Sequence, residues 1–370
     1  MRLQLKVVAS WLGLLVLFAS APSLRAQDQT RDVLKPVLPF LDDSAVLVAR
    51  LDVPAINLNA IQAWGLRLLQ QSGAPPKEIA DAVAQVPEEF GKAQKWLDDF
   101  QTAGGREVFF VAYAQPGQDA EISLLIVRVE KNADAKTLIN LARQVAFFDI
   151  AEDEPLDGPV RPTTTAPTTA AAATQPADDS QAHARLLGDA LVFGQFKDFE
   201  KLKHLKPVDR PEFGKAFAAA DSPTLCAAVV FNATLLKQLD NPNVMWFGPL
   251  SKEKLSKLRW VAVGLRPPPQ PFLHVQFQAS DANAARDIRN ELDKQLKQLA
   301  QMGMGPVAAQ LVAMLLPRQQ GDRLILALDG KQLDQMVITY YRSMRFEAPA
   351  PMPPATQPAE VAEPAQQGAK

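Results

Sequence analysis

The 370-residue sequence contains a single cysteine, Cys226, so the chain cannot form an intramolecular disulfide. Its stability must therefore come from a buried core rather than from the cross-links typical of small secreted domains. The 39 Lys and Arg residues do not exceed the 41 Asp and Glu residues, so the sequence lacks the basic excess that nucleic-acid binding normally requires. We expect a globular protein with no nucleic-acid partner.

The sequence also lacks the short motifs of common catalytic sites. It contains no G-x-S-x-G, no G-x-x-x-x-G-K-[ST] and no G-x-G-x-x-G. The three histidines, His183, His204 and His274, are far apart and have none of the spacings of a histidine metal site. Cys226 needs only one nearby base to act as a nucleophile, but its apolar surroundings in TLCAAVV favour a buried, unreactive thiol. We predict no catalytic residue, cofactor or metal from these motifs.

The apolar run near the start of the chain is too short for a comfortable membrane span. Val7 to Ala19 is thirteen residues long, whereas a spanning helix needs about 20. Arg2 and Lys6 precede the run, and small residues follow it up to Ala26. This pattern is typical of a signal peptide, here residues 1–26. We expect export to the periplasm, the cell envelope or the exterior, without a stable membrane span after cleavage; an uncleaved anchor is the alternative.

Hydrophobic periodicity predicts the same order of elements twice. In the first half, strands are predicted at 45–52, 106–114, 121–130 and 184–195, and helices within 53–100, at 132–146 and at 196–205. In the second half, strands are predicted at 224–231, 258–266, 271–279 and 322–329, and helices within 232–258, at 280–300 and at 330–344. Each half is therefore β-α-β-β-α-β followed by an extra helix.

The first strands of the two halves also share letters. DSAVLVARLDV, which starts at residue 43, matches DSPTLCAAVVF after a shift of 178, which indicates a duplication. The order β-α-β-β-α-β is that of the ferredoxin-like, or split βαβ, module. We therefore predict an α+β protein of two tandem ferredoxin-like modules with mainly antiparallel sheets, either side by side or sharing one sheet.

A segment rich in Thr, Pro and Ala, residues 161–181, resembles a linker between two domains. The second half closes on its own strand at 322–329, however, so the corresponding strand at 184–195 should belong to the first half. The predicted division is a first module at 27–206 with a disordered insertion at 158–181, a second module at 207–346, and a disordered tail at 347–370.

The region around PFLDDSAVLVARLDVPAINLNAI, residues 39–61, carries a resemblance to secreted proteins of planctomycete-type bacteria whose function is unknown. The shared features are an exported leader, an acidic and small pair before an apolar strand, and duplicated α+β halves. The spacer ATQPA also occurs twice, at 173–177 and 355–359. The resemblance implies no known activity and brings no functional residues with it.

A clear fold pattern without converging chemistry favours a non-catalytic exported protein, a binding or structural element of the cell envelope. Its expected partner is an envelope protein or polymer. One alternative is an enzyme with a site in the cleft between the halves, where Arg50 and Asp52, near the end of the first strand, are the candidates. Another is an inhibitor or chaperone-like module that pairs with an extended peptide through a sheet edge.

Overall fold

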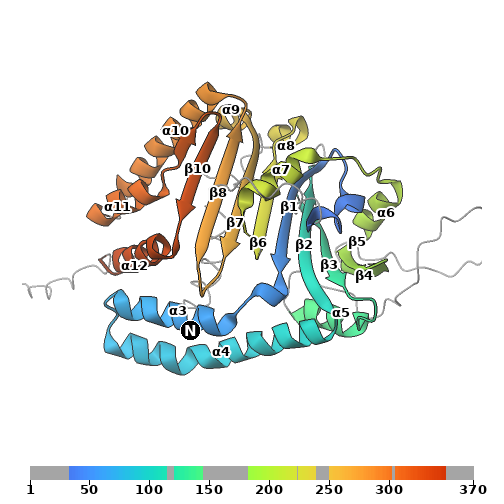
Figure 1. Ribbon diagram of the computed structural model, residues 1–370, viewed down its shortest axis with the longest axis horizontal. Coiled ribbons are helices and arrows are strands. Elements are labelled where there is room, and N and C mark those ends of the chain that lie inside the picture. Colours follow the sequence, from blue (N-terminus) through green and yellow to red (C-terminus); the bar gives the residue numbers. More distant parts are fainter. Residues whose placement is uncertain are drawn as a thin grey trace, which may run out of the picture.

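The structure, a computed structural model, describes residues 33–114, 121–144, 182–222, 224–238, 250–301 and 305–346. These residues form one open sheet of ten strands in the order β4-β5-β3-β2-β1-β6-β7-β8-β10-β9, with every neighbouring pair antiparallel (Figure 1). The α+β class and the antiparallel sheet are confirmed, and the two halves share one sheet. The predicted signal peptide, insertion and tail lie outside the described residues.

The first half contributes β1 (Ala45–Asp52), β2 (Gly105–Tyr113), β3 (Glu121–Val129), β4 (Ala182–Leu187) and β5 (Ala190–Gln195). The second half contributes β6 (Leu225–Val230), β7 (Leu258–Arg266), β8 (Phe272–Ala279), β9 (Arg318–Gln320) and β10 (Arg323–Leu328). The single strand predicted at 184–195 is in fact a hairpin, because Gly188 adopts a left-handed φ of 66° and turns the chain. β5 of this hairpin pairs with β3.

The first-half helices are η1 (Leu38–Phe40), η2 (Val53–Ala55), α3 (Leu58–Gln71), α4 (Pro76–Thr102), α5 (Ala135–Gln144) and α6 (Phe196–His204). The second-half helices are α7 (Pro211–Ala220), α8 (Ala233–Gln238), α9 (Lys252–Leu255), α10 (Ala282–Gln301), α11 (Gly305–Leu315) and α12 (Gly330–Phe346). α7 was not expected from the sequence.

The strand order does not show the predicted ferredoxin-like modules. A split βαβ unit holds two parallel strands with a third strand between them, whereas β1 and β2 are direct, antiparallel neighbours. The reason lies in the connection, which is a pair of helices rather than one. Gly73 has a φ of 76° and ends the turn after α3, so α4 runs back and returns the chain to the end of the sheet that it left (Figure 1). The next strand must then run antiparallel.

The halves have the same strand order from the centre outward, β1-β2-β3-β5-β4 and β6-β7-β8-β10-β9. They meet where β1 pairs with β6, between Leu47 opposite Val229 and Leu51 opposite Leu225. Ala49 and Ala227 are equivalent when the two first-strand segments are aligned, and they lie directly opposite each other. A local two-fold axis between β1 and β6 therefore relates the two sets of strands.

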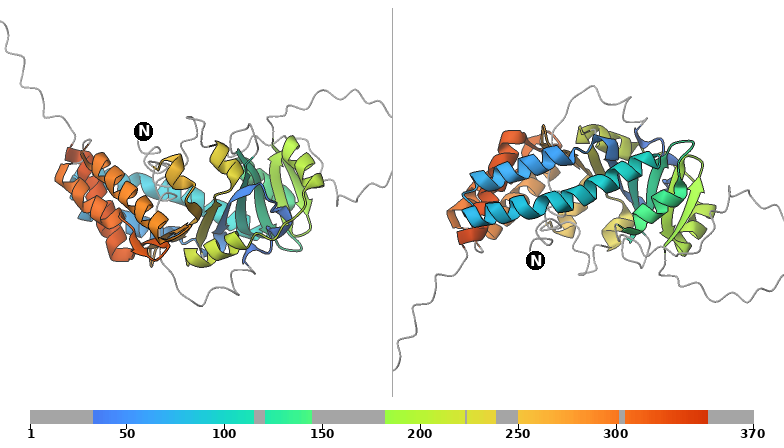
Figure 2. Two further views of the ribbon diagram at one scale, coloured as in Figure 1. Left: turned by 90° about the horizontal axis from the view of Figure 1, so that it is seen from above. Right: turned by 90° about the horizontal axis from the view of Figure 1, so that it is seen from below.

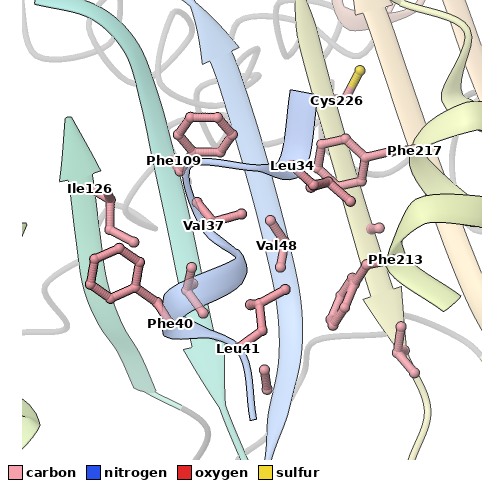
Figure 3. Packing of buried hydrophobic residues seen from close by; sticks show 14 of the residues in the cluster. Leu34, Val37, Phe40, Leu41, Val48, Phe109, Ile126, Phe213, Phe217 and Cys226 are labelled. Atoms are coloured by element: carbon pink, nitrogen blue, oxygen red, sulfur yellow. The ribbon is translucent and has the colours of Figure 1, made fainter. Parts of the chain in front are cut away.

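Both halves contribute to one hydrophobic cluster on the face covered by α7 and by residues 34–41 (Figure 3). Phe109 and Ile126 come from the first half, and Phe213, Phe217 and Cys226 from the second. The opposite face is covered by α5 and the end of α4 over the first half, and by α10 and α12 over the second. The shared cluster makes the two halves one packing unit.

A second link between the halves is the α3–α4 hairpin, which runs across both of them and reaches α12 (Figure 2). Trp64 Nε1 donates to Asp334 Oδ1 at 2.6 Å, and Arg67 forms an ion pair with the same carboxylate at 2.8 Å. Leu68 packs on Val337 in a small cluster beside these contacts. The α3–α4 hairpin thus connects the first half to the second through the contacts of α3 with α12.

Candidate charged pocket

A pocket of about 770 Å³ lies where the strands of the first half end. It is bounded by the ends of β1 and β3, the start of β2, the turn between β4 and β5, and the start of α5. Seven charged residues line it: Asp52, Arg106, Glu107, Arg128, Glu130, Lys131 and Asp189. Both signs of charge are therefore concentrated in one small volume.

Strand register places the central charges side by side. Asp52 lies opposite Glu107, and Glu107 lies opposite Arg128, so the three residues form a row across β1, β2 and β3. Arg50 precedes Asp52 by two positions and faces the same side of the sheet, because successive side chains of a strand alternate. Residues distant in the sequence are thereby brought together by antiparallel pairing.

Glu107 links Arg50 to Arg128, and we call the four residues Arg50, Asp52, Glu107 and Arg128 the charged row. Arg50 Nε donates to Glu107 Oε1 at 2.7 Å, and Arg128 Nη1 donates to Glu107 Oε2 at 3.0 Å. Arg50 Nη2 also reaches Asp52 Oδ2 at 3.2 Å. Arg50 is 8% exposed and Glu107 is 9% exposed, so this pair is buried, while Arg128 extends into the pocket. A second pair, Arg106 with Glu130, lies on the exposed rim.

The second half shows whether the fold needs these charges. The row of Asp52, Glu107 and Arg128 corresponds to Val230, Trp260 and Gln278, which pair across β6, β7 and β8 in the same order. Arg50 corresponds to Ala228. Val230, Trp260 and Ala228 all belong to the hydrophobic cluster shared by the halves. The same strand arrangement thus forms with a mainly apolar row, and the charged row is peculiar to the first half.

A different row in the second half brings Cys226 and His274 onto one face, with Gly264 between them. A Cβ atom at Gly264 would lie 1.9 Å from the Ala220 carbonyl oxygen, so the end of α7 occupies the space between the two side chains. The corresponding first-half residues are Val48, Val111 and Leu124.

Burial holds both of these groups in their neutral forms. It raises the pKa of Cys226 to about 11 and lowers the pKa of His274 to about 3. The Cys226 thiol donates to the Ser222 carbonyl oxygen at 2.6 Å. A cysteine nucleophile needs the opposite shifts, since the thiolate is the reactive species. The sequence-based interpretation of Cys226 as a buried thiol is confirmed.

The two residues singled out from the sequence lie on the strand that joins the halves. Asp52 lines the pocket, and Arg50 lies behind it, against Glu107. The sequence placed these candidates in a cleft between the halves. Where Arg50 lies, however, β1 and β6 are hydrogen-bonded neighbours, and the elements that bound the pocket belong to the first half. Glu107 and Arg128 were missed, although each is a charge that interrupts an apolar strand, in REVFF and IVRVE.

The other sequence candidates are not drawn into this site. His183 is a buried residue of β4, and His204 ends α6. Within the described ranges, no group of three or more His, Cys, Asp and Glu side chains is arranged to hold a metal ion. In the same part of the chain, no helix combines the length and apolar character needed to cross a membrane.

Comparisons with family models, with curated proteins and with solved structures gave no match to this chain.

Proposed function

We propose that the protein is exported and acts without catalysis, as a binding element of the cell envelope that uses the charged pocket. The observation that carries this proposal is the contrast between the two halves. A buried ion pair is a weak source of stability, because desolvation of the charges offsets their attraction. The second half dispenses with the charged row, so a role in binding explains its presence in the first half better than folding does.

Binding is better supported than catalysis. Glu107 is buried, and both of its carboxylate oxygens accept hydrogen bonds from guanidinium groups, so this carboxylate is engaged within the protein rather than presented to a substrate. Cys226 and His274 are buried and neutral. Asp52, the acid singled out from the sequence, also receives a hydrogen bond from Arg50.

Peptide pairing at a sheet edge is also less supported. β9, at one edge, has only three residues, and short polar edge strands resist pairing. β4, at the other edge, has its first three residues, Ala182, His183 and Ala184, buried. Both outer strands are therefore poorly suited to accept a further strand along their length.

The shared strand order also supports a duplication, and we include it in the proposal. One module would have been doubled and joined through its first strand, and the first copy then acquired the charged row. The aligned first-strand segments and the facing pair Ala49 and Ala227 support this history.

Affinity capture from the envelope fraction of the protein's own cells tests the proposed role. The bait proteins are the tagged wild type, Arg128→Gln and Arg323→Gln. Gln is the residue that the second half carries at the position of Arg128, and Arg323 is an exposed residue of β10 outside the pocket. The wild type and Arg323→Gln should retain the same protein or polymer, and Arg128→Gln should lose most of it. Equal retention by all three, or no retention by the wild type, contradicts the proposal.

A further inference from the structure

We infer that the pocket binds a dipolar ligand, one that carries both an ammonium group and a carboxylate, as free amino acids and short peptides do. This inference rests on the proposed binding function and specifies the kind of chemical group that the envelope partner presents to the pocket.

The sheet order sets out the charges in a regular sequence. The order β5-β3-β2-β1 places Asp189, in the turn before β5, at one end of the pocket and Asp52, at the end of β1, at the other. The cationic side chains of Arg106, Arg128 and Lys131 come from the adjoining ends of β2 and β3, between these two acids. The pocket thus has an acid at each end, and its middle carries the three basic side chains together with the carboxylates of Glu107 and Glu130.

Ion pairing within the protein reduces the number of charges available to a ligand. Glu107 is engaged by Arg50 and Arg128, and Glu130 is engaged by Arg106. Lys131 and Asp189 form no ion pair with another residue of the described ranges, and both are exposed. One positive and one negative side chain are therefore left on the wall of the same pocket.

A ligand of one charge sign fits this arrangement poorly. An anion that met Lys131 and Arg128 would also lie near Asp189 and Asp52, and a simple cation would lie near the three basic side chains. Like charges brought together across an interface oppose binding, whereas complementary potentials favour it. A ligand with both groups can direct its ammonium toward an acid and its carboxylate toward a base. The volume of about 770 Å³ is within the range of pockets that hold small molecules.

Probes of defined charge test this inference on the full chain. Glycine represents a free amino acid and triglycine a peptide with more widely separated charges, while acetate and methylammonium each carry one charge. Binding is followed by amide chemical shifts at constant ionic strength, because salt screens these contacts. We expect glycine or triglycine to give saturable shifts at the pocket, and acetate and methylammonium to require at least tenfold higher concentrations. The tighter of the two dipolar probes shows which spacing between ammonium and carboxylate the pocket prefers.

Two substitutions localise the binding. Lys131→Gln and Asp189→Asn remove the charges without breaking an ion pair of the described residues, and each should weaken the dipolar probe about tenfold. Arg323→Gln should leave its affinity unchanged. Equal affinity for acetate, for methylammonium and for the dipolar probes overturns the inference, and so does a failure of both pocket variants to weaken binding. If the dipolar probes do not bind but envelope capture depends on Arg128, the ligand class is wrong and the binding function stands.

Discussion

Glu107 is the residue that holds the charged row together, because its two oxygens join Arg50 and Arg128. Its removal leaves Arg50 buried with only part of its compensating charge. Breaking a buried pair from one side costs about 3 kcal/mol or more. We therefore predict that Glu107→Ala lowers the free energy of unfolding by about 3 kcal/mol in urea denaturation.

Glu130→Ala is the matched control, since it removes a carboxylate of the same pocket from an exposed pair with Arg106. Exposed pairs contribute about 1 kcal/mol or less. Similar small losses of unfolding free energy for the two variants would show that the pair of Glu107 with Arg50 does not behave as a buried ion pair.

His274 makes the stability of the fold depend on pH. Burial lowers its pKa from 6.5 to about 3, so between these values the unfolded chain binds a proton that the folded chain does not. Stability therefore falls as the pH falls below about 6.5, by about 1.4 kcal/mol per pH unit from this group.

His274→Leu, which carries the residue of the equivalent position Leu124, should remove this part of the slope. The measurement compares unfolding free energies of the two proteins between pH 7.5 and pH 4.5. The wild type should lose stability more steeply than the variant below pH 6.5. Parallel profiles would show that His274 does not cause this part of the pH dependence. Other titrating groups are common to both proteins and cancel in the comparison.

At the scale of elements, the contact of α7 with the sheet depends on the absence of a side chain at Gly264. The Ala220 carbonyl oxygen would lie 1.9 Å from an added Cβ, and a backbone atom cannot move aside as a flexible side chain can. We predict that Gly264→Ala destabilises the protein by about 3 kcal/mol, the upper range for overpacking. Thermal or urea denaturation measures this loss.

Gly214→Ala provides the opposite case in the same helix. Apart from the neighbouring residues and backbone of its own helix, no atom lies within 4 Å of a Cβ built at Gly214, and alanine favours the helix over glycine by up to about 1 kcal/mol. This variant should be slightly more stable than the wild type. A destabilised Gly214→Ala, or a neutral Gly264→Ala, would contradict the described packing of α7.

Most elements could be predicted because their signals are local. Apolar alternation marked the hairpin strands β2, β3, β7 and β8, and the stripe of α10 contains Ala285 and Ile288, which are fully buried. α7 was missed because its sequence, PEFGKAFAAA, opens with Pro and contains Gly, which are typical of a connection. Its helix is held by tertiary contacts of Phe213 and Phe217 rather than by a strong local pattern.

The site was harder to predict because it depends on register between distant segments. Arg50 and Asp52 were chosen from their place at the end of one strand, but a single strand does not reveal what lies opposite. Glu107 and Arg128 enter only when β1, β2 and β3 are paired in the observed order. The ferredoxin-like order would not have made β1 and β2 neighbours, so the row could not have been derived from it.

At the scale of the whole molecule, the two halves should unfold together. They share the pairing of β1 with β6, the cluster on the α7 face and the contacts between α3 and α12. We predict a single calorimetric transition with equal calorimetric and van't Hoff enthalpies. Two separate transitions would show that each half has an independent core.

The central claim is that the charged row serves binding and that the fold does not require its exposed member. The most direct measurement is a comparison of Arg128→Gln with the wild type in unfolding free energy and in retention of the envelope partner. The variant should lose about 1 kcal/mol of stability, as for one partly exposed ion pair, and most of its binding. Retention equal to that of the wild type, or unfolding of the variant, would contradict the claim.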